Sequence, residues 1–318
     1  MDNYKKLQEL IKVYEETEIW KYIDGDDIFK LNGFDDNVYV SIMGNAGIEY
    51  SIGIYYGDDD LFSQLDIVYG EYSTSPDASI HLGTFKIALG KPEKLLSDAN
   101  RKILKKNKIK PVNVVFRFNP GRIVRLVTEE ECLLLIEILN RIIKVADYII
   151  NNEMDFEKDF RKMYNFSEKD GKVLVRKINY PKLKAKDIKQ EKLDVDLVSK
   201  GNWITPKGTY NVFLVYAPMY DINTGDYPVM LLVQNNKNYL VVGMELIESK
   251  NTDKIASKVL AIFINNKIIP NNIIFNSSLI SNICSEFIKE FKIKVHINNE
   301  NDDLNLMWNS IGDSLGKL

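Results

Sequence analysis

The sequence contains few of the residues that build covalent or metal-bound frameworks. Its 318 residues include two cysteines, two histidines and nine prolines. These counts exclude a disulfide framework and a zinc cluster made of cysteine and histidine ligands. The net charge is also small, −3 at neutral pH, so the chain as a whole is not attracted to nucleic acid or to an anionic membrane.

Long uncharged apolar runs are absent as well. The most apolar stretch of helix length, Leu133 to Ile150, is interrupted by four charges, at Glu137, Arg141, Lys144 and Asp147. A segment with that many charges cannot span a bilayer. The first nine residues are polar and lack the apolar core of a secretory signal. We therefore expect a cytoplasmic protein with no membrane partner.

What the chain does contain is an ordinary globular composition, with 45% hydrophobic and 27% charged residues. At roughly 150 residues per domain, its length predicts two domains. Between Lys169 and Lys192 lie nine lysines and arginines with little periodicity. We interpret this region as a connector that contains one short strand, because connections of that length are uncommon inside a domain. The predicted boundaries are 1–165 for the first domain, 166–200 for the connector and 201–318 for the second domain.

The charges are unevenly distributed along the first domain. Glu15 to Asp77 holds fifteen acids and two lysines, whereas Lys91 to Arg125 holds eleven bases and two acids. The basic stretch, with Lys102, Lys105 and Lys106, could bind nucleic-acid phosphates. Alternatively, it folds beside the acidic stretch and the two charges offset each other. We expect the second arrangement, because the bases between Lys91 and Lys110 are not interleaved with aromatic residues.

The first domain is predicted to be an α+β domain built on antiparallel hairpins. Two strand-like segments, residues 38–43 and 48–55, flank Gly44-Asn45-Ala46-Gly47, a typical hairpin connection. Thr128 and Glu131 have the spacing of a capping box, which predicts a helix that starts there. The remaining elements follow from apolar periodicity: helices over 4–17, from Asp58 and over 92–106, and strands over 84–89 and 112–118.

The second domain is predicted to follow the order β-β-β-α-β-α-β-α. Its strands are expected at 210–218, 227–234, 239–247, 272–275 and 293–297, and its helices from 252, around 279–291 and over 302–315. Three successive strands indicate an antiparallel meander, and the alternation that follows indicates parallel strands with crossover helices. The sheet should therefore be mixed, and the chain as a whole α+β.

No sequence motif of a hydrolase, nucleotide-binding loop or metalloprotease is present. His81 and His296 lie in strand-like segments and could act as general bases, although a hydrogen-bonded structural role is expected. Cys132 lies at a helix start, where the helix dipole lowers a thiol pKa. Both Cys132 and Cys284 are nevertheless expected to be buried apolar residues.

Two acidic clusters and a group of tyrosines each allow a functional and a structural interpretation. Asp24 to Asp27 and Asp58 to Asp60 could bind a hard cation, but they lack the alternating spacing of a calcium loop. Turn formation and charge at a helix N-terminus are expected instead. Five tyrosines crowd one region and could form a binding surface, although packing of half-buried hairpins explains them as well: Tyr50, Tyr55, Tyr56, Tyr69 and Tyr72.

Five segments resemble a little-characterised bacterial family of two-domain proteins that are known as domains of unknown function. The segments in the first domain are residues 38–44, 52–57 and 116–121, the last of which reads Phe-Arg-Phe-Asn-Pro-Gly. Those in the second domain are residues 227–233 and 270–275. The resemblance covers most of the chain and supplies no catalytic residue.

The order of elements in the second domain also resembles the ribonuclease H-like fold. In its active form, that fold implies carboxylates that hold two divalent ions, Mg or Mn. The first strand of this chain has no acid, and neutral Gln234 and Asn276 end two other strands. Glu245, Asp302 and Asp303 could serve as ligands, together with one further acid that the sequence does not place. We therefore expect a non-catalytic binding or regulatory protein with no cofactor, and a protein partner rather than nucleic acid. The alternative is a metal-dependent nuclease or phosphodiesterase.

Overall fold

The computed structural model describes residues 2–70, 78–92, 96–154, 156, 162–182, 208–248 and 254–298. It divides the chain into two compact units. The first unit consists of Met1–Gln64, Leu82–Asn119 and Val124–Leu183. The second consists of Leu65–His81, Pro120–Ile123 and Lys184–Leu318. Two short segments from the first half of the chain thus belong to the second unit.

The first unit is built on an eight-stranded sheet with the order β6-β5-β4-β3-β2-β1-β7-β8. Its strands are β1 (Phe29–Leu31), β2 (Val38–Met43), β3 (Ser51–Tyr56), β4 (Thr84–Ala88), β5 (Val114–Phe118), β6 (Arg125–Leu126), β7 (Lys162–Lys169) and β8 (Lys172–Asn179). All neighbouring strands are antiparallel except β1 and β7, which are parallel. The predicted hairpin is confirmed, since β2 pairs with β3.

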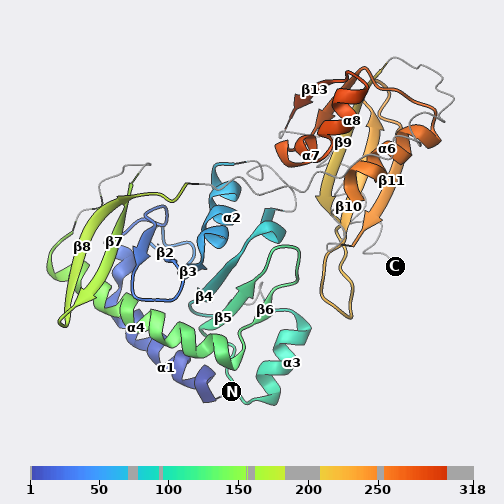
Figure 1. Ribbon diagram of the computed structural model, residues 1–318. Coiled ribbons are helices and arrows are strands. Elements are labelled where there is room, and N and C mark those ends of the chain that lie inside the picture. Colours follow the sequence, from blue (N-terminus) through green and yellow to red (C-terminus); the bar gives the residue numbers. More distant parts are fainter. Residues whose placement is uncertain are drawn as a thin grey trace. The chain divides into compact units, whose positions relative to one another are not determined.

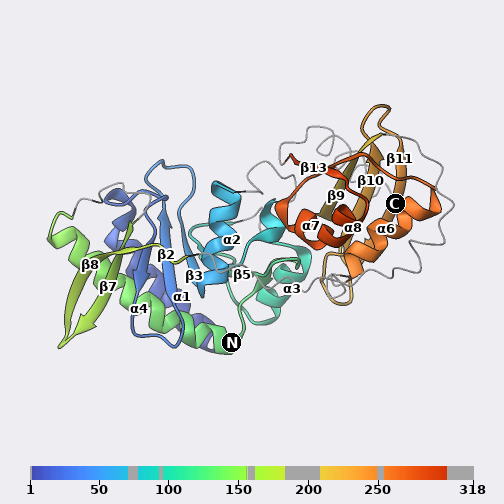
Figure 2. The same ribbon diagram turned by 45° about the horizontal axis from the view of Figure 1, so that its top comes forward.

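Helices α1 (Asp2–Thr17) and α4 (Glu129–Asn151) lie beside each other against one face of this sheet (Figures 1 and 2). Shorter helices complete the unit: α3 (Asp98–Lys106), a single turn η1 (Ile19–Lys21), and the start of α2 (Asp58–Val68). The predicted capping box of α4 is present. The Glu131 N–H donates to the Thr128 hydroxyl at 3.2 Å, and the Thr128 N–H donates to the Glu131 carboxylate at 2.8 Å.

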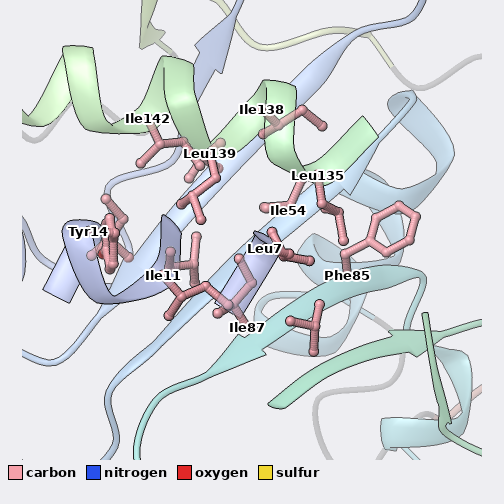
Figure 3. Close-up of a cluster of buried hydrophobic side chains, with 14 of the residues drawn as sticks. Leu7, Ile11, Tyr14, Ile54, Phe85, Ile87, Leu135, Ile138, Leu139 and Ile142 are labelled. Carbon is pink, nitrogen blue, oxygen red and sulfur yellow. The ribbon is translucent and has the colours of Figure 1, made fainter. Parts of the chain in front are cut away.

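The core of the first unit lies between these two helices and the sheet. Leu7 and Ile11 of α1 and Leu139 of α4 point toward Ile54 and Ile87 on the strands (Figure 3). All five are fully buried. An apolar residue at every third or fourth position gives each helix one apolar stripe, and burial of that stripe stabilises the helix more than its intrinsic propensity does.

Two buried tyrosines of α1 differ in their hydrogen bonding. The Tyr4 hydroxyl accepts a bond of 3.1 Å from the Val115 N–H, whereas the Tyr14 hydroxyl has no partner among the described residues. Both rings are fully buried. Burial raises the pKa of Tyr4 to about 12, and it raises the pKa of Tyr14 as well. Neither phenol therefore ionises near neutral pH.

This difference predicts stability changes of opposite sign. Tyr14→Phe removes an unpaired buried hydroxyl and should raise the free energy of unfolding by about 1 kcal/mol. Tyr4→Phe leaves the Val115 N–H without an acceptor and should lower it by about 1–3 kcal/mol. Urea denaturation of the two variants measures both changes. Equal losses in the two variants would contradict the prediction.

The predicted start of the connector at residue 166 is wrong. Residues 166–179, assigned to it from their lysine content, complete β7 and form all of β8, a hairpin of the eight-stranded sheet. The predicted short strand at 173–175 lies inside β8. The buried side chains of β7 explain the difference: Met163 and Phe166 are buried, Phe166 in the core, while lysines occupy the ends of the strand. Most of the remaining predicted connector lies outside the described residues.

The second unit contains a five-stranded mixed sheet with the order β11-β10-β9-β12-β13. Its strands are β9 (Thr209–Tyr216), β10 (Val229–Asn235), β11 (Val241–Ile247), β12 (Asn272–Phe275) and β13 (Lys294–Ile297). The first three are antiparallel neighbours, and β12 runs parallel to both β9 and β13. The predicted meander followed by parallel strands is therefore confirmed.

Three helices pack on one face of the five-stranded sheet: α6 (Ile255–Asn265), α7 (Ser278–Ile283) and α8 (Ser285–Glu290). The single helix predicted around 279–291 is two short helices, with Cys284 at their junction. The predicted helix at 302–315 lies outside the described residues. Mixed helices and sheets in both units confirm the α+β class.

None of the helices in the described part of the chain has both the length and the apolar character needed to cross a bilayer.

Candidate ligand-binding site

The loop that joins β9 to β10 continues their hairpin beyond the two strands. The Ala217 N–H donates to the Pro228 carbonyl at 2.8 Å, and the Asp221 N–H donates to the Asp226 carbonyl at 2.9 Å. At the tip, the Asp221 carboxylate accepts from the Asn223 N–H at 2.7 Å. This side-chain bond to the backbone two residues later is an Asx turn. The loop therefore holds its side chains in defined positions.

A segment distant in sequence, Pro120–Ile123, pairs with this loop within the same unit. The Ile123 N–H donates to the Gly225 carbonyl at 2.9 Å, and the Tyr227 N–H donates to the Gly121 carbonyl at 2.8 Å. These bonds make the segment a short antiparallel neighbour of the loop. It includes Pro120 and Gly121, the last two residues of the Phe-Arg-Phe-Asn-Pro-Gly segment.

Gly121 in this segment requires glycine for two reasons. Its φ is +73°, and a Cβ there would lie 2.9 Å from the Tyr216 ring. On the same side, the Gly121 N–H donates to the Ile80 carbonyl at 2.8 Å. His81, expected in a strand, instead ends a short helical turn, η2 (Ala78–His81), and its ring centre lies 4.9 Å from that of Tyr216.

A pocket of about 450 Å³ opens beside the loop. The described residues that line it are Met219, Tyr220, Asp221, Thr224, Asp226, Pro228, Leu246 and Glu248. Seven of these eight residues belong to the loop or to the end of β11, and Glu248 directly follows that strand. Pockets of this size that combine apolar walls with a few polar groups are typical of ligand sites.

Tyr220 in the wall of the pocket forms an aromatic pair with Tyr227, another residue of the loop. The rings of Tyr220 and Tyr227 have centres 5.6 Å apart and meet edge to face. Burial, together with the nearby Tyr220, raises the pKa of Tyr227. Tyr220 itself is 47% exposed, so one face of the pair remains available to a ligand.

An exposed apolar surface continues from the pocket along β11. Register pairs Leu246 with Met230 and Met244 with Leu232, so these four side chains share one face of the sheet. Met230 and Leu232, on the inner strand, are buried, whereas Met244 is 56% and Leu246 is 52% exposed. The apolar face of the sheet therefore reaches solvent at its edge strand. We call Met244, Leu246 and Val241 of β11 the edge surface.

The charge around the pocket is acidic. Asp221, Asp226 and Glu248 contribute three carboxylates to its lining. The Arg122 guanidinium lies 2.8 Å from the Asp226 carboxylate and offsets one of them. Asp221 adds a further carboxylate to the lining, which favours a cationic or positively polarised ligand.

Of the three residues predicted as metal ligands, the structure describes Glu245 alone. Glu245 points to the opposite face of β11, where it forms an ion pair with Lys258 of α6. In the sheet order, β11 is three strand intervals, about 14 Å, from β12, after which Asn276 lies. Asp302 and Asp303 lie outside the described residues. Within the described ranges, no group of three or more His, Cys, Asp or Glu side chains could hold a metal ion.

Gln234 and Asn276, the neutral residues at the predicted metal positions, form hydrogen bonds through their side-chain amides. The Asn276 side chain accepts from the Leu214 N–H at 3.0 Å and donates to the Leu214 carbonyl at 3.1 Å. The Gln234 side chain donates to the Tyr239 carbonyl at 3.1 Å and accepts from Asn211 at 3.3 Å. Each amide thus joins two segments of the second unit.

The predicted nucleic-acid residues Lys102, Lys105 and Lys106 are exposed on α3. Among the described residues, no ion pair involves them. The arginines of the same basic stretch differ, since Arg117 pairs with Asp60 and Arg125 with Glu131. Arg117 thus pairs with the acidic stretch Glu15–Asp77, as expected, whereas Arg125 pairs with an acid outside that stretch.

A comparison with protein families identifies relatives of both halves of the chain. The model of a family described as Domain of unknown function (DUF7309) matches residues 4–167, just over half of the chain. The chain belongs to this DUF7309 family. A second model, described as Domain of unknown function (DUF6930), matches residues 205–311. No curated protein matches the chain.

The two cysteines and His296 are the remaining candidates in this DUF7309 chain. Cys132 and Cys284 are buried, as expected, and burial together with the Glu129 and Glu131 carboxylates raises the pKa of Cys132 to about 12. This outweighs the dipole effect that the sequence suggested. His296 is exposed on β13.

The acidic clusters form a turn and a helix start, as predicted. The Asp24 N–H donates to the Asp27 carboxylate at 3.0 Å, and Asp58 accepts from the Tyr39 hydroxyl at 2.6 Å. Among the tyrosines, Tyr55 is buried against Ser41 at 3.0 Å, and burial raises its pKa to about 12. Tyr72 lies outside the described residues.

The sequence analysis did not find the pocket. Its residues come from a long hairpin loop and the end of an edge strand, which share no motif. One signal was present: Met219, Tyr220 and Ile222 are large apolar residues in a segment predicted as a connection, where polar residues prevail. All three are exposed in the structure.

Proposed function

We propose that this protein is a non-catalytic binding protein whose second unit binds an extended segment of a partner protein along β11. The edge surface on β11 is the observation that carries the proposal. Eight of the nineteen large apolar side chains that are exposed in the described residues lie between Met219 and Leu246. Such a concentration is typical of an interaction site, because monomeric proteins rarely expose contiguous apolar patches.

The geometry of β11 favours an extended partner. It is an edge strand of the five-stranded sheet (Figure 1), and no described strand pairs with its outer side. Edge strands present unpaired backbone donors and acceptors, to which an added strand binds by main-chain hydrogen bonds. Alternate side chains of that added strand would then contact Met244 and Leu246.

A comparison with the other sheet supports this interpretation. β8, an edge strand of the eight-stranded sheet, carries Lys172, Arg176 and Lys177. Lysines on an edge strand discourage pairing with other chains. β11 has no lysine or arginine, and its one charge, Glu245, is engaged by Lys258 on the face that α6 covers. Among the four described edge strands, β6, β8, β11 and β13, only β11 therefore has no lysine or arginine.

The ribonuclease H-like resemblance and the cytoplasmic location are parts of the same proposal. The strand order of the second unit agrees with that resemblance, and the ion pair of Glu245 favours a fold without the metal chemistry. Both cysteines are buried and form no disulfide, which is typical of a reducing compartment.

Selection from a displayed library of random linear peptides tests the proposal. We expect enriched peptides that alternate apolar or β-branched residues with polar ones, with affinities measured by fluorescence anisotropy. Met244→Lys combined with Leu246→Lys should weaken binding at least tenfold, because burial of one leucine contributes about 1.5–3 kcal/mol. Leu174→Lys, at an equally exposed position on β8, is the control and should leave affinity unchanged. A selection without enrichment, or equal losses in both variants, would overturn the proposal.

A further inference from the structure

The pocket at the end of β11 has walls of two kinds. Met219, Pro228 and Leu246 form an apolar lining, and Tyr220 adds an aromatic ring. Asp221 and Glu248 add carboxylates to the same lining. A cavity lined by both apolar side chains and carboxylates favours neither an anionic nor a purely apolar ligand. It suits a side chain with an apolar stem and a positive end.

The Asp221 carboxylate has room for a ligand. It receives one hydrogen bond, from the Asn223 N–H, and a carboxylate can accept several more. Asp221 is also exposed. Asp226 differs because Arg122 already lies 2.8 Å from it. Asp221 is therefore the acid of the pocket best placed to accept from a cationic ligand.

The pocket and the edge surface are adjacent because they share one residue. Leu246 belongs to both, since it lines the pocket and is exposed on the outer face of β11. A strand added along β11 would pass Met244 and then Leu246 before it reached the pocket. A side chain near one end of that strand could therefore enter.

We propose that this pocket binds an arginine side chain of the partner segment, a specificity that rests on the proposed function. The guanidinium stacks on the Tyr220 ring and donates to the Asp221 carboxylate, while its methylene stem contacts Met219 and Leu246. Arginine fits better than lysine, because its planar, weakly hydrated head stacks on aromatic rings and donates in two directions at once. The partner segment is thus extended and apolar, with an arginine near one end.

A pair of small probes tests the pocket without any peptide. Nα-acetyl-arginine amide carries the cation, and Nα-acetyl-citrulline amide is its neutral isostere. Each is titrated into the full chain labelled at the methionine methyl groups, with the Met219 signal assigned from Met219→Leu. We expect the arginine probe to shift the Met219 signal in the millimolar range. The citrulline probe should bind at least fivefold more weakly, and added salt should weaken the arginine probe alone.

Two variants test whether the charge of Asp221, rather than a change in structure, accounts for binding of the arginine probe. Asp221→Asn keeps an oxygen for the Asn223 N–H and removes the charge, so it should weaken the arginine probe about threefold to tenfold with unchanged thermal stability. Asp98→Asn, on exposed α3 of the first unit, is the matched control and should have no effect. Equal binding of the two probes, or no Met219 shift with arginine, would overturn the arginine pocket. The peptide selection would still stand in that case if Met244→Lys with Leu246→Lys abolished binding, so the two failures are distinguishable.

Discussion

Asp60→Ala is expected to lower the free energy of unfolding of the first unit by about 3–5 kcal/mol, the usual cost of removing one partner of a buried ion pair. The Arg117 Nη1 lies 2.7 Å from the Asp60 Oδ2. Their side chains are only 15% and 12% exposed, so water cannot replace the lost carboxylate. The same oxygen accepts from the Tyr56 N–H at 3.3 Å, and that donor would also lose its partner.

A double substitution tests this explanation. Arg117 also lies over the Phe85 ring, 4.3 Å from its centre, so methionine at 117 keeps much of the packing. Asp60→Ala with Arg117→Met should therefore be more stable than Asp60→Ala alone, since no unpaired charge remains buried. Urea denaturation with hydrogen exchange at β3 and β4 reports on this unit specifically. A loss below about 1 kcal/mol in Asp60→Ala would mean that the pair behaves like a surface salt bridge.

The parts of the fold that sequence predicted correctly depend on near neighbours in the chain. Thr128 and Glu131 satisfy each other's backbone across one helical turn, and Gly44 and Gly47 close a hairpin by a 2.9 Å bond. Such contacts leave a local pattern of residue types at fixed spacing. Helix α4 and the β2–β3 hairpin were accordingly recognisable from sequence alone.

The pairing of β1 with β7 could not be predicted in that way. Phe29 pairs with Tyr164 and Leu31 with Phe166, across more than a hundred residues. A strand of three residues is too short for a periodic signal, and the lysines at the ends of β7 resembled a connector. Only the assembled sheet gives these segments their partners, and this explains why 166–179 was misassigned.

The candidate site was unpredictable for a similar reason. Glu245 was considered as a metal ligand from its place in a strand, but the sheet order puts that strand at an edge and its carboxylate against Lys258. The pocket depends on Leu246 lying beside the 217–228 loop. No spacing in the sequence encodes that contact, because it requires both the register of β10 with β11 and the extended hairpin of the loop.

Leu139→Ala in α4 is expected to lower the free energy of unfolding of the first unit by about 2–5 kcal/mol. Leu139 is fully buried between α4, α1 and the sheet (Figure 3). Alanine has the highest helix propensity, so the helix itself is not weakened, and the loss measures the cavity and the apolar surface removed.

Leu133→Ala provides the control within the same helix. Leu133 is 56% exposed, and its truncation should change stability by no more than about 0.5 kcal/mol. Both variants are compared by urea denaturation, in which an unchanged slope shows that the unfolded state is unaffected. Similar losses at the two positions would mean that α4 does not pack against the sheet through its Leu135, Leu139 and Ile142 stripe. A large loss at Leu139 alone is expected because that side chain belongs to the core that α1, α4 and the sheet share.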